Sequence, residues 1–170
     1  MEKTKQIAVT AIFTAMYFIL SALLKIPVAG HITLDLGYIA LTVSAVFLGP
    51  ISTVCVGALG VILESALMSQ RGVSPGWIVM NIIVGYFCGL VLHKNANEGN
   101  KKLIISAVIV VPASMLVGVA AKTLIDCVLY SLPLAAKIPT GIAAWILDSI
   151  VMLAFGLPLS IALKKYGLKP

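Results

Sequence analysis

Long apolar runs separated by short polar segments dominate the chain. Six runs can be distinguished, with approximate bounds 7–24, 33–48, 51–68, 77–92, 103–132 and 140–163. An α-helix needs about 20 mostly apolar residues to cross the hydrocarbon core of a bilayer, within a range of roughly 17–25. The pattern therefore predicts an all-α membrane protein in which six transmembrane helices form one compact bundle, a single integral membrane domain over residues 1–170.

Two of the runs depart from the ideal length. The run 33–48 is short, contains Asp35 near its start and stops at Gly49-Pro50. The run 103–132 is long enough to tilt or protrude, and Pro112 is expected to kink it because proline lacks a backbone N–H. The exact ends of the second and fifth helices therefore stay open.

Composition excludes most classes of soluble protein. Hydrophobic residues make up 61% of the chain and charged residues 11%, whereas soluble domains carry about 45–50% apolar and roughly 25% charged residues. A chain of 170 residues cannot bury this excess inside one globule. An ordinary soluble enzyme, a disordered tail and a secreted disulfide scaffold are therefore excluded.

Basic residues lie mainly at the ends of the apolar runs, where lysine and arginine set the orientation in the bilayer. The net charge is +6, from 12 Lys and Arg against 6 Asp and Glu. With both termini inside, eight basic residues are cytoplasmic and only Lys25, Arg71 and Lys137 are external, which predicts an N-in, C-in orientation. No basic patch is interleaved with aromatic residues, so we expect the lipid bilayer, and no nucleic acid, as a partner.

Motifs for catalysis and for cofactors are missing from the sequence. There is no G-x-x-x-x-G-K-[ST] phosphate loop, no H-E-x-x-H and no G-x-S-x-G. The three cysteines, Cys55, Cys88 and Cys127, are scattered inside apolar runs and lack metal-ligand spacing. We therefore expect no enzyme activity, no metal, no cofactor and no ATP hydrolysis by this chain itself.

Ionisable side chains inside membrane spans are costly, so each one is a candidate functional residue. The apolar runs contain Glu64, Lys122, Asp126 and Asp148, together with the amide Asn81 and the boundary residue Asp35. In the predicted orientation all six lie in the outer half of the membrane. This clustering predicts a polar site that opens toward the outside.

Two interpretations of these polar residues remain open. Lys122 and Asp126 are four positions apart, so they share a helix face and can form a structural ion pair. A dry site would favour protonation of the remaining acids, whereas a water-filled cavity would let them bind a polar molecule. Trp145, like Tyr38 and Trp77, could belong to an interfacial aromatic belt or stack on a bound ring.

The outer loop 26–36, with the sequence IPVAGHITLDL, suits a gate over such a cavity. It contains Pro27, Gly30 and His31. A second outer loop, SQRGVSPG, is also rich in glycine and proline. Both loops are therefore candidates to cover the site.

The first helix carries a stripe of small residues. Ala8, Ala11 and Ala15 are separated by three and four positions and so fall on one helical face. Small residues let another helix approach closely within a membrane. The stripe predicts either internal packing or docking of a separate membrane subunit.

The architecture and one stretch of sequence resemble the substrate-binding S components of energy-coupling factor (ECF) vitamin importers. The local likeness lies within residues 36–92, as LGYIALTVSAVFLGPISTVCVGALGVILESAL, then a loop with Pro-Gly, then WIVMNIIVGYFCGLVL. In that family an apolar helix two stops at a Gly-Pro turn, and a Gly-rich helix three and a second small-residue helix follow. The likeness in architecture covers nearly the whole chain.

The resemblance implies a high-affinity binder of a vitamin or related heterocycle in the cell membrane of a prokaryote. Such a protein captures its substrate outside, topples, and releases it inside on a transmembrane T subunit driven by two ATPase subunits. The alanine stripe would contact the T subunit, and the outer loop 26–36 would act as the gate. The substrate-binding residues would come from Glu64, Asn81, Lys122, Asp126, Asp148, Trp145 and Asp35.

The charge of the site limits the classes of substrate that could bind. Glu64, Lys122, Asp126 and Asp148 together carry −2 when all are ionised, from three acids and one base. This balance favours a cationic or hydrogen-bond-donating ring over an acid such as biotin or lipoate, because carboxylates accept hydrogen bonds. A queuosine precursor or a ring of the pyrimidine or pyridoxine type fits, and a folate type is possible. A small self-contained secondary transporter or channel, or a structural membrane subunit, is the alternative function.

Overall fold

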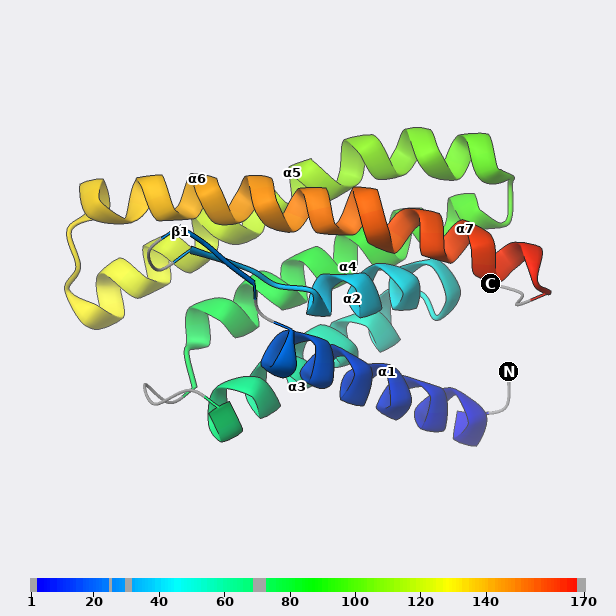
Figure 1. Ribbon diagram of the computed structural model, residues 1–170, viewed down its shortest axis with the longest axis horizontal. Helices are drawn as coiled ribbons and strands as arrows, with labels where there is room; N and C mark the ends of the chain where they lie inside the picture. The colour runs from blue at the N-terminus through cyan, green and yellow to red at the C-terminus, as the bar shows by residue number, and fades with distance from the viewer. Residues whose placement is uncertain (1–2, 25, 30–31, 69–72, 168–170) are drawn as a thin grey trace.

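The computed structural model describes residues 3–24, 26–29, 32–68 and 73–167 (Figure 1). Its elements, in chain order, are α1 Lys3–Leu23, β1 Ile26–Ala29, β2 Ile32–Leu34, α2 Gly37–Phe47, α3 Pro50–Met68, α4 Pro75–Ala96, α5 Asn100–Tyr130, α6 Leu134–Val151, η1 Met152–Gly156 and α7 Leu157–Lys165. The turn η1 is π-helical and joins α6 to α7 without a break. The fold is therefore almost entirely helical, which confirms the predicted fold class.

Five of the described helices are long and apolar enough to cross a membrane: α1, α3, α4, α5 and the continuous α6–α7. The remaining predicted span corresponds to α2, which has 11 residues and a length of about 16 Å. The hydrocarbon core is roughly 30 Å thick, so α2 reaches across only about half of it. The helix starts later than the apolar run does, because Ile32–Leu34 forms strand β2 instead.

The outer segment before α2 is a β-hairpin and not an irregular loop. Strands β1 and β2 are antiparallel and pair Ile26 with Leu34 and Pro27 with Thr33. Gly30 and His31, the other two predicted gate residues, lie outside the described residues. Figure 1 shows the hairpin reaching from one end of the bundle toward its middle, where α2 begins. The predicted gate therefore contains paired strands, whereas a loop was expected from the sequence.

The two ends of the bundle differ in what they carry. At one end, here called the terminal end, Figure 1 shows the start of α1, the α2–α3 and α4–α5 connections and the end of α7. At the other, here called the hairpin end, it shows the β1–β2 hairpin, the start of α4 and the α5–α6 connection. Both ends of the described chain thus lie together, as the predicted topology requires.

Helix α2 lies in the centre of the bundle. Its residues 40–46 are buried, and it contacts α1, α3, α4 and the α6–η1–α7 helix. The hydroxyls of Thr42 and Ser44 donate hydrogen bonds to the carbonyls of Tyr38 and Leu41. These bonds satisfy the two hydroxyls within the helix itself, so this part of α2 can be buried without a polar partner from another helix.

Candidate functional site

Three fully buried side chains from three helices meet inside the bundle: Tyr17 of α1, Tyr38 of α2 and Asn81 of α4, here called the polar centre. The Tyr17 hydroxyl donates to Asn81 Oδ1 at 3.2 Å, and Asn81 Nδ2 donates to the Trp77 carbonyl at 3.0 Å. The two tyrosine rings meet edge to face, with centroids 6.1 Å apart. The Tyr38 hydroxyl has no hydrogen-bond partner of ordinary geometry among the described residues. Because an unmet polar atom is costly inside a membrane protein, the centre is suited to meet a bound molecule.

Three of the predicted acids lie near this polar centre. The carboxylates of Asp35, Glu64 and Asp148 lie within electrostatic range of the Tyr17 hydroxyl. Asp148 is only 3% exposed, whereas Asp35 and Glu64 are half-buried. They come from the hairpin–α2 junction, α3 and α6, so tertiary packing gathers acids that are far apart in the sequence.

Asp35 also fixes the start of α2. Its Oδ1 accepts a hydrogen bond from the Gly37 backbone N–H at 2.8 Å, and its Oδ2 accepts one from the Ser21 hydroxyl at 2.9 Å. A carboxylate beside the first turn of a helix satisfies a free N–H and interacts favourably with the helix dipole. Asp35 therefore ties the first turn of α2 to α1, next to the polar centre.

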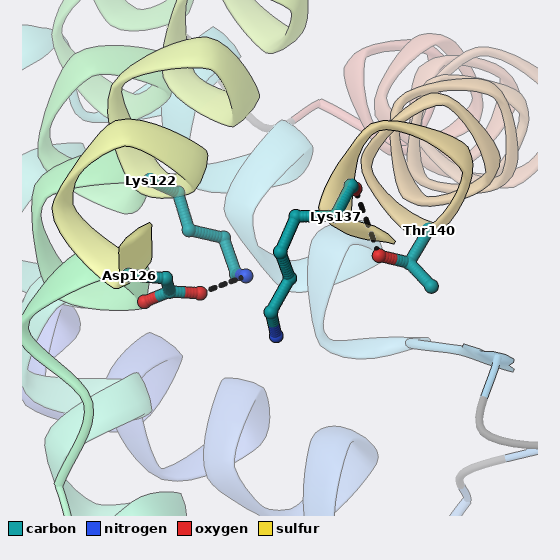
Figure 2. A network of polar contacts seen from close by, with 4 residues as sticks. All are labelled: Lys122, Asp126, Lys137 and Thr140. Carbon is teal, nitrogen blue, oxygen red and sulfur yellow. Dashed lines mark hydrogen bonds and ion pairs between the residues drawn. The ribbon is translucent and has the colours of Figure 1, made fainter. Parts of the chain in front are cut away.

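Lys122 and Asp126 form the ion pair that their four-residue spacing predicts. Lys122 Nζ lies 2.7 Å from Asp126 Oδ2, and the side chains are 16% and 7% exposed (Figure 2). The same ammonium lies 4.5 Å from the ring centroid of Trp77, a cation–π distance. Trp77 thus contacts the ion pair through its ring and the polar centre through its carbonyl, which links the two groups along α4.

Asp126 lies against the first turn of α4. A Cβ on Gly76 would be 2.6 Å from Asp126 Oδ1, so only glycine allows this approach. The helix dipole of α4 favours a negative charge at this position. Asp126 Oδ1 is nevertheless buried without a hydrogen-bond partner among the described residues. Asp126 Oδ1 could therefore accept a hydrogen bond from a bound molecule.

Trp145 and Ser149 flank Asp148 on α6. The Trp145 indole N–H donates to the Pro112 carbonyl at 2.8 Å, so it anchors α6 to α5, and the ring is half-buried against the core. The Ser149 hydroxyl is buried with no partner in the described part of the chain. The π-helical turn η1 begins three residues after Ser149, and such turns are frequent at functional sites.

The structure gathers most of the predicted site residues and adds others. Asn81 accepts a hydrogen bond from Tyr17, and Asp35, Glu64 and Asp148 lie near the same tyrosine. Lys122 and Asp126 lie on the ring side of Trp77, whose carbonyl binds Asn81. Tyr17, Ser21 and Ser149 were not among the residues predicted for the site. Thr14, Tyr17 and Ser21 recur at intervals of three and four residues, and this polar spacing on one face of an apolar helix was the available signal.

The alanine stripe faces away from the bundle. Ala8, Ala11 and Ala15 are exposed, while α1 buries Tyr17 and its neighbours Thr14 and Ser21 on another face. Internal packing therefore does not account for the stripe within the described structure. Its surface is available to lipid or to a neighbouring subunit.

Comparison with known proteins identifies the family. The model of the family described as ECF-type riboflavin transporter, S component, matches residues 1–165. A UPF0397 protein of Exiguobacterium sp. (strain ATCC BAA-1283 / AT1b) is 32% identical over 109 residues, which are 60% of this chain and 58% of the relative. The chain thus aligns with about three fifths of the length of that curated relative. The matched family is one of transport proteins and not of enzymes, and the chain belongs to this family of ECF S components.

Proposed function

We propose that this chain is the substrate-binding subunit of an ECF-type importer in the cell membrane of a prokaryote. It captures a vitamin or related heterocycle from outside and passes it inward together with a T subunit and two ATPase subunits. The observation that carries this proposal is the polar centre with three acids around it, in a chain whose family supplies such subunits. A structural subunit would gain nothing from burying these groups, because each is costly inside a membrane.

Orientation supports capture from outside. The charge balance of eight internal against three external basic residues favours cytoplasmic termini. The start of α1 and the end of α7 lie at the terminal end, and the hairpin leads from the opposite end toward the start of α2, whose first turn carries Tyr38. In this orientation the hairpin end faces outside, and the β1–β2 hairpin with Pro27 acts as the gate.

Chemistry favours a ring that donates hydrogen bonds. The carboxylates of Asp35, Glu64 and Asp148 accept such bonds, and Asn81 can both donate and accept. A queuosine precursor and rings of the pyrimidine, pyridoxine or folate type meet this requirement. Riboflavin, which the family description names, also carries a ring N–H and several hydroxyls. We therefore propose a neutral or cationic heterocycle rich in donors as the substrate class.

The exposed alanine stripe supports docking of the T subunit. Ala8, Ala11 and Ala15 leave a shallow surface on α1 where another helix can approach closely. A self-contained channel would need polar groups that continue to the terminal end, but the hydroxyls nearer that end are bonded to nearby carbonyls. Thr53 and Ser160, for example, donate to carbonyls of Gly49 and Gly156 next to their own helices and do not line a polar path.

Mass spectrometry of small molecules released from the detergent-purified protein tests the proposal. A heterocycle should accompany the wild-type protein and be lost from Asp148→Ala and Asn81→Ala. Ser160→Ala is the matched control, because it removes a buried hydroxyl near the terminal end. A heterocycle retained equally by all variants would contradict the site. No heterocycle in any sample, and no binding of added vitamins, would favour the channel or structural alternatives.

A further inference from the structure

A short series of contacts along the start of α4 joins the ion pair of α5 to the polar centre. Lys122 Nζ lies 2.7 Å from Asp126 Oδ2 and 4.5 Å from the centroid of the Trp77 ring. The Trp77 carbonyl accepts a hydrogen bond from Asn81 Nδ2 at 3.0 Å. We propose that Lys122 and Asp126 form a positioning pair, which acts on substrate binding by holding Trp77 and, through its carbonyl, Asn81. The inference rests on the proposed function and gives the pair a role other than contact with the substrate.

The first turn of α4 has little support of its own. Ser74, at the position before the helix, makes no side-chain capping hydrogen bond, and the bond from the Ile78 N–H to the Ser74 carbonyl is long, at 3.4 Å. The first N–H groups of a helix have no partner within the helix, so an uncapped end frays readily. The position of Trp77 therefore depends on contacts from outside α4.

The positioning pair supplies such contacts from α5. A Cβ on Gly76 would lie 2.6 Å from Asp126 Oδ1 and 3.1 Å from Lys122 Cγ, so both side chains pack directly on the backbone of the first turn. The helix dipole favours the Asp126 carboxylate at this end, and the Lys122 ammonium over the Trp77 ring adds a cation–π attraction. Because both charged side chains are largely buried, salt screens these interactions little. The pair thus holds both the backbone and a side chain of the first turn.

Asn81 depends on this turn for its orientation. Its Nδ2 donates to the carbonyl of Trp77, one turn earlier in the same helix, and its Oδ1 accepts from the Tyr17 hydroxyl at 3.2 Å. An amide has donors on one side and an acceptor on the other, so these two bonds decide which atom faces which neighbour. The nitrogen and the oxygen each have the capacity for one more hydrogen bond. If the Trp77 carbonyl moves, this remaining donor and acceptor are no longer held in place for a bound molecule.

Side-chain amide signals in NMR spectra of the ligand-free protein, isotopically labelled at asparagine, test the positioning role. Lys122→Met together with Asp126→Ala removes both charges at once, so neither is left buried and unpaired. The Asn81 signals should shift in this double variant, because the Trp77 carbonyl is released. The signals of the other asparagines should stay unchanged, since these residues lie in or beside the α4–α5 connection: Asn95, Asn97 and Asn100. Replacing those three in turn with glutamine identifies their signals and leaves those of Asn81.

A second ion pair in the chain provides the matched control. Glu98 and Lys102 have the same four-residue spacing, but they are exposed and lie at the α4–α5 connection. Glu98→Ala together with Lys102→Met removes this pair and should leave the Asn81 signals unchanged. A shift of equal size in the control would mean that Asn81 responds to any loss of charge, and it would overturn the positioning role.

Affinity for riboflavin, the vitamin that the family description names, is the second measurement, made on the full chain in detergent. Loss of the positioning pair should weaken binding tenfold or more. Lys122→Arg should lose less than the double variant, because it keeps a cation beside Asp126 and the Trp77 ring. The control that lacks Glu98 and Lys102 should bind as the wild type does.

The outcomes separate this inference from the proposed function. Unchanged Asn81 signals overturn the positioning role, and if binding is weaker in the same variant, the pair contacts the substrate itself. Shifted signals with unchanged affinity overturn it as well, because the position of Asn81 then does not matter for binding. A wild-type protein that binds no riboflavin and carries no co-purified heterocycle counts against the proposed function. The positioning role is then decided by the amide signals alone, which need no ligand.

Discussion

Tyr17 and Asn81 join α1 to α4 through a single hydrogen bond of 3.2 Å that is fully buried. The tyrosine uses its only proton in this bond, and the amide uses its oxygen. The carboxylates of Asp35, Glu64 and Asp148 lie around the same hydroxyl. The Tyr17–Asn81 hydrogen bond is therefore close to the acids that are proposed to bind the substrate.

Replacing Tyr17 with phenylalanine should test the hydrogen bond separately from the packing of the ring. Tyr17→Phe keeps the ring but leaves Asn81 Oδ1 without its donor, and an unmet buried acceptor costs about 1–3 kcal/mol. We expect a lower melting temperature in detergent and weaker substrate binding. Tyr86→Phe, at an exposed position on α4, is the matched control. Equal melting temperatures for the two variants would show that the Tyr17 bond contributes little.

Gly60 is expected to be intolerant of any side chain. A Cβ at this position would lie 2.4 Å from Tyr17 Cδ1, so Gly60→Ala must displace the ring that carries the hydroxyl. Overpacking of this kind costs about 1–3 kcal/mol. Thermal unfolding should show this loss, and Ala66→Val, exposed on the same helix, should not. A fully stable Gly60→Ala protein would contradict the close contact between α1 and α3.

Bulky residues on the alanine stripe should separate assembly from binding. Ala11→Trp and Ala15→Trp point away from the bundle, so the fold and substrate affinity should be retained. Copurification with the T and ATPase subunits should be lost, because the tryptophan prevents close approach of a second helix. Ala113→Trp, exposed on α5, is the control for added bulk facing the lipid. Loss of substrate binding in Ala11→Trp would mean that the stripe supports the site itself.

The connection between α4 and α5 should show a weak and predictable pH effect. The hydrogen bond and charge of Lys102 lower the pKa of the Glu98 carboxyl. A depressed folded-state pKa contributes stability above the unfolded value of about 4.3, and this is lost as pH falls through the folded-state pKa. Lys102→Met should return the Glu98 pKa toward its ordinary range, measurable by NMR titration. Because the pair is exposed, the melting temperature at neutral pH should hardly change.

Much of the fold could be predicted because lipid imposes a simple rule on sequence. Apolar runs of sufficient length must be helices in a bilayer, and this rule located the five described helices that are long enough to span one. It failed at residues 33–36, which read as part of a span although Asp35 is used to cap α2 from outside it. Hydropathy also cannot distinguish a paired strand from a loop in a segment as short as 26–36. The hairpin depends on a partner strand and not on local composition.

Site residues could be predicted only where their side chains are of a type that is rare in membrane spans. Lys122 and Asp126 could be recognised because charged residues are rare in spans. Their spacing of four residues also predicted that they would pair. Tyr17 did not stand out, since a tyrosine in an apolar helix can face lipid, core or ligand equally well.

The segment from β1 to α2 has a different structure in each half of the membrane. A buried helix of 11 residues occupies one half, and a two-stranded ribbon leads into it from the other. A two-stranded ribbon is only marginally stable alone, whereas α2 is enclosed by the surrounding helices. Among the described elements outside the ribbon, only α6 packs on it, through β2, so we expect the ribbon to deform more readily than α2. The hairpin can thus open for a solute while α2 keeps the surrounding helices in place.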